Sequence, residues 1–252
     1  MSPADQESKL AARGLRPDRW SPRLRQALDL AAGRLKPVPQ LQQPTVFNYP
    51  GLPQVRFYDP ARFPWAAEIE AATPAILEEL KALTAGGTDE FQAYVHVKTE
   101  EIDLGPNEAL LQNRDWSVLF LSENNWIVPK VVERCPRTWD TVLKAPLPRV
   151  SGWGPTVVFS LLKAGARIAP HHGTHNTRLI CHLPLVVPPG CGFRVGDEVR
   201  EWEVGKLMIF DDTIEHEAWN DSQEDRIVLI FDIWRPELSD QEKFELTLLF
   251  SD

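Results

Sequence analysis

The sequence is poor in cysteine and contains no long apolar run. Cys135, Cys181 and Cys191 are the only cysteines among 252 residues, and no two of them form a CxxC pair. So sparse a set argues against a disulfide framework or a structural zinc site, and it favours a reducing compartment. No segment approaches the ~20 apolar residues that cross a bilayer, and the start of the chain lacks the basic and apolar stretches of a secretory signal. These absences predict a cytoplasmic protein with no membrane partner.

Positive charge is also scarce, with 27 Lys and Arg residues against 36 Asp and Glu residues and a net charge of -9. A nucleic-acid partner would favour a basic face, so we expect none. The length suits one domain with a substantial core and room for an extension. Residues 1–53 are expected to form a polar extension with a short helix and a Pro-rich linker. Residues 54–252 are expected to form the main domain, with its core in residues 153–238.

The first half of the chain is expected to be mainly helical. Residues 1–21 are polar without a clear period, which predicts loose order. Five prolines in Pro37–Pro53 indicate extended chain, either a free linker or a strap packed across the core. Apolar residues at helical spacing predict a helix over Phe63–Leu83, with Pro74 interrupting or kinking it. The remaining predicted elements are a helix at Pro22–Leu35 with Ser21 as its N-cap, strands at Gln92–Val97 and Trp116–Leu121, and a helix at Pro136–Val142.

The second half is dominated by short runs rich in β-forming residues, separated by Gly, Pro and Asp. Six such runs within about eighty residues predict an antiparallel sandwich or barrel. A final helix over Ser239–Phe250 begins with a capping box made by Ser239 and Glu242. The fold class is therefore α+β, with a jelly-roll-like core between N-terminal helices and a C-terminal helix. The predicted strands are Thr156–Lys163, Arg178–Val187, Gly192–Val195, Glu198–Glu203, Lys206–Phe210 and Ile227–Trp234.

Two histidines and one arginine carry the chemical signal. His171 follows Pro170 near a strand end, and His216 follows a predicted buried strand. Two imidazoles from separate strand ends suit a catalytic first-row metal such as iron, zinc or copper. Arg226 lies on an otherwise apolar strand, and a buried arginine needs a charged partner, which a substrate carboxylate supplies through paired hydrogen bonds. The pattern predicts an oxygen-activating site that uses a small diacid cosubstrate.

Three motifs resemble the aspartyl/asparaginyl β-hydroxylase family. They are PHxG at Pro170–Gly173, FDDxxEHxxWN at Phe210–Asn220 and RxxLxxDxWxPEL at Arg226–Leu238. The resemblance is clear over residues 157–238 and reaches back more loosely to Phe57. It implies a double-stranded β-helix (jelly-roll or cupin-like) and an iron(II)- and 2-oxoglutarate-dependent dioxygenase. Such an enzyme hydroxylates an unactivated carbon while 2-oxoglutarate and O2 are converted to succinate and CO2.

The resemblance also implies roles for individual residues. His171 and His216 would bind iron, and because Gly173 stands where a facial triad carries its carboxylate, water would take the third protein position. Arg226 and Ser160 would hold the distal carboxylate of 2-oxoglutarate. His182 shares a strand face with Arg178 and would reach the metal-binding carboxylate, and Arg178 is grouped with these cosubstrate-binding residues.

Other residue assignments concern the acid pair and the remaining histidines. Asp212 is expected near the metal, where it orients bound water, whereas Asp211 is structural. His172 and His175 are interpreted as loop histidines, because Pro170 and Gly173 disfavour a helix there; one of them touching substrate stays an alternative. His96 is expected to be structural.

The substrate is less well determined than the chemistry. Ile180 stands where the eukaryotic hydroxylases carry a substrate-binding arginine, which puts peptide Asp or Asn substrates in doubt. We expect an amino acid or a peptidyl Asp/Asn-like substrate, with its wall supplied by Phe57–Pro148. Two alternatives belong to other classes: a non-catalytic cupin-like binding module, and a zinc hydrolase that uses His171, His175 and His216 as ligands.

Overall fold

The structure is a computed structural model that describes residues 2–95 and 105–251. Its helices are α1 Pro3–Ala12, η1 Pro17–Arg19, α2 Pro22–Ala31, η2 Pro60–Arg62, α3 Ala66–Ala71, α4 Thr73–Thr84, η3 Gly105–Leu110, α5 Pro129–Val132, α6 Pro136–Val142 and α7 Asp240–Phe250, where η marks a 3-10 helix. Its strands are β1 Phe57–Tyr58, β2 Gln92–Ala93, β3 Trp116–Glu123, β4 Trp126–Ile127, β5 Val157–Leu162, β6 Arg167–His171, β7 Arg178–Val186, β8 Cys191–Val195, β9 Glu198–Arg200, β10 Met208–Phe210, β11 His216–Asn220 and β12 Arg226–Trp234.

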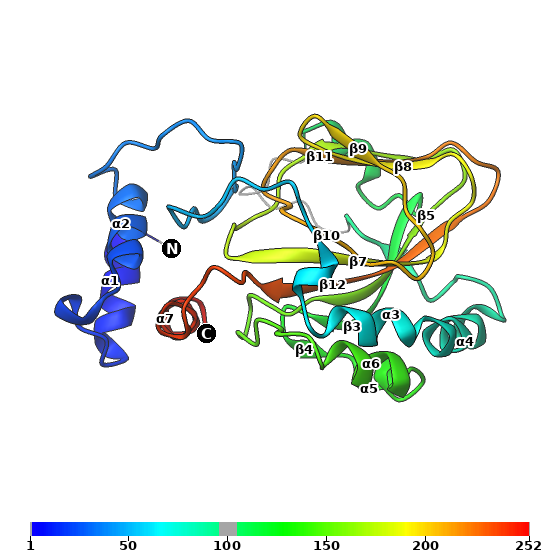
Figure 1. Cartoon of the computed structure of the whole chain (residues 1–252), viewed down its shortest axis with the longest axis horizontal. Coiled ribbons are helices and arrows are strands. Elements are labelled where there is room, and N and C mark those ends of the chain that lie inside the picture. Colours follow the sequence, from blue (N-terminus) through cyan, green and yellow to red (C-terminus); the bar gives the residue numbers. More distant parts are fainter. Residues whose placement is uncertain (1, 96–104, 252) are drawn as a thin grey trace.

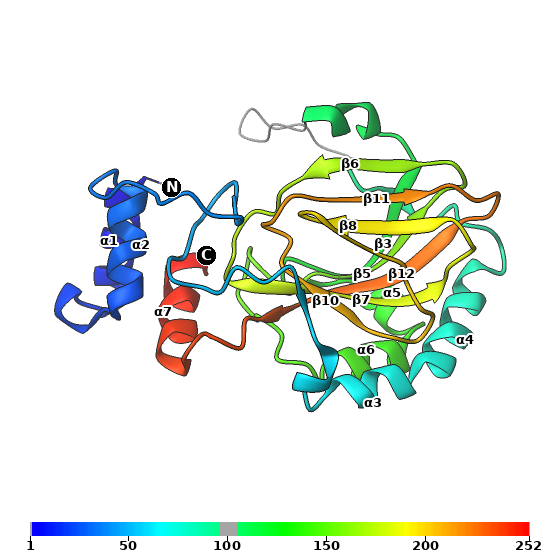
Figure 2. The same cartoon turned by 45° about the horizontal axis from the view of Figure 1, so that its top comes forward.

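Two antiparallel sheets face each other. The larger has the strand order β1-β10-β7-β12-β5-β3-β2, with β4 paired to β3, and the smaller has the order β6-β11-β8-β9. Figures 1 and 2 show the smaller sheet lying over one face of the larger one. This is the predicted α+β class, a cupin-like double-stranded β-helix flanked by helices.

The central strands of the larger sheet are buried on both faces. Odd-numbered residues such as Phe159, Cys181 and Phe231 pack with Ile76 and Val142 in one apolar core. The helices α3 to α6 cover that face (Figure 1). Because successive side chains of a strand point to opposite faces, the even-numbered residues face the smaller sheet, where the site forms.

Residues 2–21 form helices and pack against the rest of the chain, so the prediction of a loose segment there was wrong. Ser2 caps α1 in a capping box with Asp5. The buried Leu10 and Leu15 pack with α2 and α7 in a second apolar core, which also contains Leu246. Burial of these leucines offsets the chain entropy that a polar segment alone would not overcome.

The Pro-rich segment is a strap packed against the barrel, the second of the two alternatives that the prolines left open. Phe47, Tyr49 and Leu52 are buried in the second core. Isolated bridges pair Gln42 with Ile214 and Phe47 with His175. We refer to residues 37–53 as the strap.

Several element boundaries differ from prediction. Phe63–Leu83 forms two helices that break at Ala72, with Pro74 in the first turn of α4. The helix at Pro22 ends at Ala31, the strand at Gln92 covers two residues, and His96 lies outside the described residues. Strands β6 and β11, which carry the two candidate metal ligands, were not predicted as strands. Across the described ranges, no helix combines the length and apolar character needed to cross a membrane.

Candidate active site

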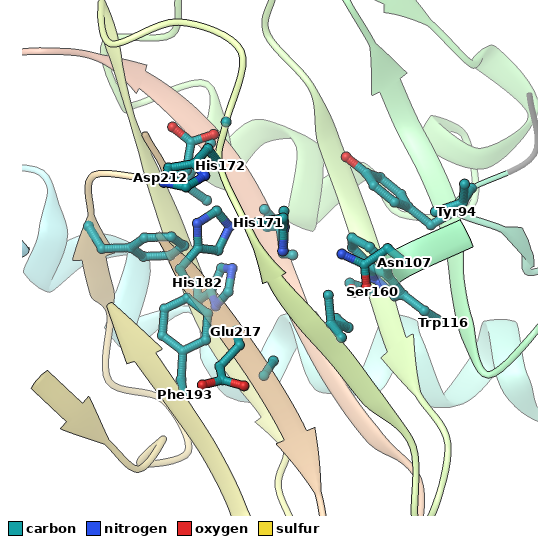
Figure 3. A pocket seen from close by; sticks show the side chains of 18 of the residues that line it. Tyr94, Asn107, Trp116, Ser160, His171, His172, His182, Phe193, Asp212 and Glu217 are labelled. Atoms are coloured by element: carbon teal, nitrogen blue, oxygen red, sulfur yellow. Dashed lines mark hydrogen bonds between the residues drawn. The ribbon is translucent and has the colours of Figure 1, made fainter. Parts of the chain in front are cut away.

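A pocket of about 280 Å³ lies between the two sheets. Figure 3 shows His171 and His182 directed into it, opposite Ser160, Trp116 and Tyr94. The seven residues predicted to bind metal or cosubstrate or to act in catalysis all line its walls: Ser160, His171, Arg178, His182, Asp212, His216 and Arg226.

His171 and His216 form a cross-strand pair at one end of the β6–β11 ladder in the smaller sheet. His171 ends β6, His216 begins β11, and the two are Cα partners in the ladder with ring centroids 4.1 Å apart. Nδ1 of His171 lies 2.8 Å from the carbonyl oxygen of Ala169, and Nδ1 of His216 lies 3.1 Å from that of Ile214. Because a carbonyl only accepts, each Nδ1 carries a proton and each Nε2 keeps a lone pair.

The electrostatic environment favours the neutral form of both rings. Burial lowers the pKa of His171 despite its hydrogen bond to Ala169. Burial, reinforced by the neighbouring His171, lowers the pKa of His216 further. A neutral imidazole whose Nδ1–H is held by a backbone carbonyl is the usual state of a metal-binding histidine. The pair therefore has the chemistry of two metal ligands.

Gly173 and Asp212 approach each other closely beside this pair. A Cβ atom added to Gly173 would lie 2.1 Å from Oδ2 of Asp212, and Gly173 N–H donates to the Asp212 carbonyl at 2.7 Å. Burial raises the pKa of Asp212 to about 6, against the opposing effect of Arg178. Arg178 Nη2 lies 3.4 Å from Oδ2 of Asp212, while Oδ1 has no hydrogen-bond partner within the described part of the chain.

Arg178, Ile180 and His182 share one face of β7 and all line the pocket, as the alternation predicted. Arg178 is the Cα partner of Trp234 at one end of β12, whereas Arg226 begins the other end of that strand. Eight strand steps of ~3.3 Å separate these positions by roughly 26 Å. The pocket thus has one arginine at each end and His182 between them.

The Arg226 end of the pocket holds a buried cation that has no hydrogen-bonded anion among residues 2–95 and 105–251. The residue is 1% exposed, and its Nε and Nη1 atoms lack hydrogen-bond partners among the residues described. Its guanidinium lies 4.7 Å from the ring centroid of Trp202, and burial lowers its pKa to about 10. Such a group requires an anion to satisfy it, and a carboxylate matches its geometry.

Tryptophans set the orientation of the neighbouring polar groups. Trp202 Nε1–H donates to Nδ1 of His182 at 3.3 Å, so the His182 proton resides on Nε2. Trp116 Nε1–H donates to Oγ of Ser160 at 3.2 Å, and the Trp116 ring stacks on Tyr94 with centroids 4.1 Å apart. These aromatic residues were not predicted to belong to the site, because a tryptophan in a strand or polar loop is ordinarily structural.

The predicted wall from Phe57–Pro148 is present in part. Tyr94, Val95, Asn107 and Trp116 contribute to the pocket lining. The Asn107 amide exchanges two hydrogen bonds with the Ala169 backbone, at 2.8 and 3.1 Å. It therefore fixes its segment beside the strand that carries His171.

His172 and His175 lie in different surroundings. His172 lines the pocket. His175 is buried, stacks on Trp153 with ring centroids 4.0 Å apart and contacts Thr177 Oγ1 at 2.8 Å. Within the described ranges, no group of three or more His, Cys, Asp or Glu residues is arranged to hold a metal ion. The three-histidine arrangement of the zinc alternative is not formed.

The two sheets and the pocket between them define a cupin-like double-stranded β-helix protein whose site carries a histidine pair. The family model described as Aspartyl/Asparaginyl beta-hydroxylase matches residues 70–236. The chain belongs to this family, which confirms the resemblance seen in its motifs.

Relatives of this chain are named as hydroxylases. It is 34% identical over 182 residues to the Ornithine lipid ester-linked acyl 2-hydroxylase of Rhizobium tropici, covering 71% of this chain and 60% of that protein. It is 35% identical over 150 residues to the human Aspartyl/asparaginyl beta-hydroxylase, covering 59% of this chain and 20% of that protein. The chain thus spans less than two thirds of either relative. The cupin domain of Schizosaccharomyces pombe Cnp3 is a similar solved structure, with 7% identity, a TM-score of 0.33 and coverage of 48% of this chain and 66% of that one.

Proposed function

We propose that this protein is an iron(II)- and 2-oxoglutarate-dependent dioxygenase that hydroxylates an unactivated carbon. The observation that carries the proposal is Arg226, a buried cation without a hydrogen-bonded anion among the described residues. It shares one pocket with two neutral imidazoles, His171 and His216. A small diacid that bridges a metal and an arginine satisfies both features of the site at once.

The residues present fit the proposed groups. His171 and His216 would hold iron through Nε2, and Arg226 with Ser160 would hold the distal carboxylate of 2-oxoglutarate. Bound iron would supply the activation of O2 that is coupled to conversion of 2-oxoglutarate to succinate and CO2. His182, with its proton on Nε2, would donate a hydrogen bond to a carboxylate oxygen of the same diacid.

The chain's own contribution is positioning and exclusion of water. Asp212 enters the space beside Gly173, and its Oδ1, which has no hydrogen-bond partner among the residues described, is available to water or ligand in the pocket. Arg178, which begins β7 at the end of the pocket away from Arg226, contacts Asp212 and Asp232. We therefore assign Arg178 to the substrate side of the pocket rather than to the cosubstrate side predicted from sequence. Apolar side chains such as Phe193, Phe210 and Ile168 line the remaining wall and keep the site dry.

For the substrate we propose an amino acid or a peptidyl Asp/Asn-like residue whose carboxylate approaches Arg178. A second candidate is an acyl chain. It is favoured by Ile180 and Ile230, which place apolar surface in the same part of the pocket lining, and by the name of the Rhizobium relative. Comparing turnover of free amino acids, peptides and acylated lipids distinguishes the two candidates.

The test of the cofactor assignment is anaerobic visible absorption. Apoprotein receives iron(II) and then 2-oxoglutarate, and the expected result is a weak metal-to-ligand charge-transfer band. The band should vanish in His171→Ala and remain in His175→Ala, whose ring lies outside the pocket lining. Bound iron without the band would contradict the dioxygenase proposal and favour a binding module.

A further inference from the structure

The strap lies across both segments that carry the histidine pair. Gln43 N–H donates to the Thr213 carbonyl at 2.7 Å, and Gln42 pairs with Ile214. On the other side, Thr45 N–H donates to the Gly173 carbonyl at 3.0 Å. Val46 N–H donates to the Thr174 carbonyl at 2.8 Å. Gly173 lies two residues after His171, and Ile214 lies two residues before His216.

These contacts connect segments that are distant in the sequence. The ladder pairs β6 with β11 up to His171 and His216. Beyond these two residues, the segment after β6 and the segment before β11 leave the sheet. The strap donates backbone hydrogen bonds to both of these segments, next to the end of the ladder. Because a chain without such partners would be free to move, the strap restrains the separation of the two imidazoles.

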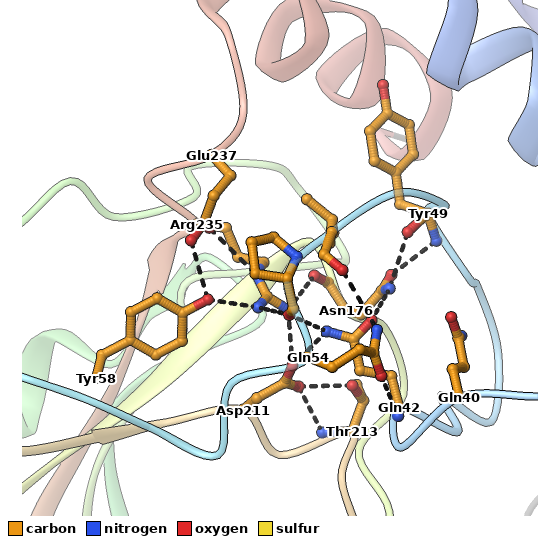
Figure 4. A network of polar contacts seen from close by, with 12 residues as sticks. Gln40, Gln42, Tyr49, Gln54, Tyr58, Asn176, Asp211, Thr213, Arg235 and Glu237 are labelled. Carbon is orange, nitrogen blue, oxygen red and sulfur yellow. Dashed lines mark hydrogen bonds and ion pairs between the residues drawn. The ribbon is translucent and has the colours of Figure 1, made fainter.

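Gln42 is the anchor of this arrangement. Its side chain is 2% exposed. Its amide nitrogen donates to Oδ2 of Asp211 at 2.6 Å, and its amide oxygen accepts from Asn176 at 3.0 Å and from Gln54 at 2.9 Å. Figure 4 shows Gln42 at the centre of this buried network. Every polar atom of the Gln42 amide is therefore engaged.

Asp211 accepts three further hydrogen bonds in this network. Arg235 Nη1 donates to Oδ2 of Asp211 at 2.7 Å, while Thr213 donates to Oδ1 from its backbone N–H at 3.0 Å and from its hydroxyl at 2.6 Å. Asp211 and Arg235 are both fully buried. These hydrogen bonds fix one side of the turn at residues 211–213. The Asp212 side chain projects from the other side of the turn into the pocket.

We infer that Gln42 is a positioning residue for the proposed metal site. Through Gln42, the strap fixes the positions of Asp212 and of the two segments that carry His171 and His216. The inference rests on the proposed function, because it assigns Gln42 to the geometry of that same site. Gln42 lies outside the pocket lining, so its effect is transmitted through Asp211 and the backbone. Mutation of a residue that supports a metal ligand typically weakens metal affinity by roughly 10- to 100-fold.

The test measures Mn²⁺ binding by electron paramagnetic resonance, with Mn²⁺ as a probe that requires neither O2 nor turnover. Gln42→Ala is expected to weaken Mn²⁺ binding about tenfold, at a temperature where the variant is folded. Gln43→Ala, an exposed neighbour of the same type on the strap, should bind as the wild type does. Gln54→Ala removes one support of Gln42 and should give a smaller loss in the same direction, which keeps the inference testable if Gln42→Ala does not fold.

A purely structural role for Gln42 is separated by a second control. Ser21→Ala removes the side-chain cap of α2 and a buried bond to Glu245, far from the pocket lining. It should lower Tm without changing Mn²⁺ affinity. Wild-type affinity in folded Gln42→Ala would overturn the inference while leaving the proposed function intact. Failure of the wild type to bind Mn²⁺ or iron would overturn both.

Discussion

The carboxylate of Asp212 occupies the space that a side chain at Gly173 would need. A Cβ atom at position 173 would lie 2.1 Å from Oδ2 and 2.3 Å from Cγ of Asp212. The carboxylate of a facial triad would begin at this Cβ. In this chain a carboxylate enters the same space from the turn before β11 instead. The Asp212 side chain can therefore take this position only because residue 173 is glycine.

This relationship predicts strong coupling between the two positions. Gly173→Ala should destabilise the protein by about 1–3 kcal/mol through overpacking. In an Asp212→Ala background the same change should cost less, with a coupling energy of about 0.5–3 kcal/mol. Urea unfolding of the four proteins measures this cycle, and additive effects would contradict the steric account. Gly173→Asp in the Asp212→Ala background should also bind Mn²⁺ more tightly than Asp212→Ala alone.

Arg226 has no hydrogen-bonded anion in the part of the chain that the structure describes, and this predicts that its effects on stability and on ligand binding differ. Removing a buried cation without an anionic partner relieves its desolvation cost. Arg226→Met should therefore unfold at an equal or higher urea concentration than the wild type in the absence of ligands. With metal present, 2-oxoglutarate at a hundred times its Kd should stabilise the wild type by about 2.7 kcal/mol. At the same concentration it should stabilise Arg226→Met by only about 0.4–1.4 kcal/mol, because loss of the charge-assisted hydrogen bonds weakens 2-oxoglutarate binding roughly ten- to hundredfold.

Arg235 provides the matched control for this comparison. It is as buried as Arg226 but pairs with Asp211 at 2.7 Å. Because breaking a buried pair leaves an unpaired charge, Arg235→Met should lose about 3–5 kcal/mol of stability. Equal losses in the two variants would show that Arg226 is compensated in the free protein.

Trp202 is expected to set the tautomer of His182. Trp202→Phe keeps a ring over Arg226 but removes the N–H that donates to His182 Nδ1. Loss of one hydrogen bond of about 0.5–1.5 kcal/mol predicts 2-oxoglutarate binding weaker by roughly two- to tenfold, with Mn²⁺ binding unchanged. Nitrogen NMR of the histidines should report the change of tautomer. Trp139→Phe, on α6 behind the larger sheet, is the control, and equal binding in both variants would remove Trp202 from this role.

Much of the fold followed from apolar pattern. Strands β5, β7 and β12 are nearly continuous apolar runs because both of their faces are buried, and α7 begins at the predicted capping box of Ser239 and Glu242. The alternation along β7 placed Arg178 and His182 on the pocket face. All seven predicted site residues reach one pocket because the strands and the turn that carry them belong to two sheets that face each other.

What escaped prediction has a common physical cause. In strands β6 and β11 the apolar signal is interrupted by Pro170, His171, His216 and Asn220. The strap gave no periodic signal because its hydrogen bonds are made to distant segments. Helix α1 was missed because its stability comes from Leu10 packing against distant parts of the chain, which local sequence does not reveal.

The last prediction concerns pH and the attachment of the N-terminal helices. Glu242 accepts from Arg23 Nε at 2.6 Å and from the Ser239 backbone at 2.9 Å. Burial alone would raise the pKa of Glu242, but these hydrogen bonds outweigh it and lower the pKa. A carboxylate with a lowered folded-state pKa stabilises the fold above its unfolded-state pKa of about 4.3, and this contribution disappears as pH falls through the folded-state pKa.

Glu242→Gln should therefore cost about 1–3 kcal/mol at pH 7, and the difference from the wild type should shrink as pH falls below about 4.3. Urea unfolding at a series of pH values measures both parts. Glu7→Gln, which breaks the exposed pair with Arg34, should change stability by less than about 1 kcal/mol at every pH. A pH-independent loss in Glu242→Gln would mean that the side chain acts through packing, because only a charge-dependent interaction is removed by protonation.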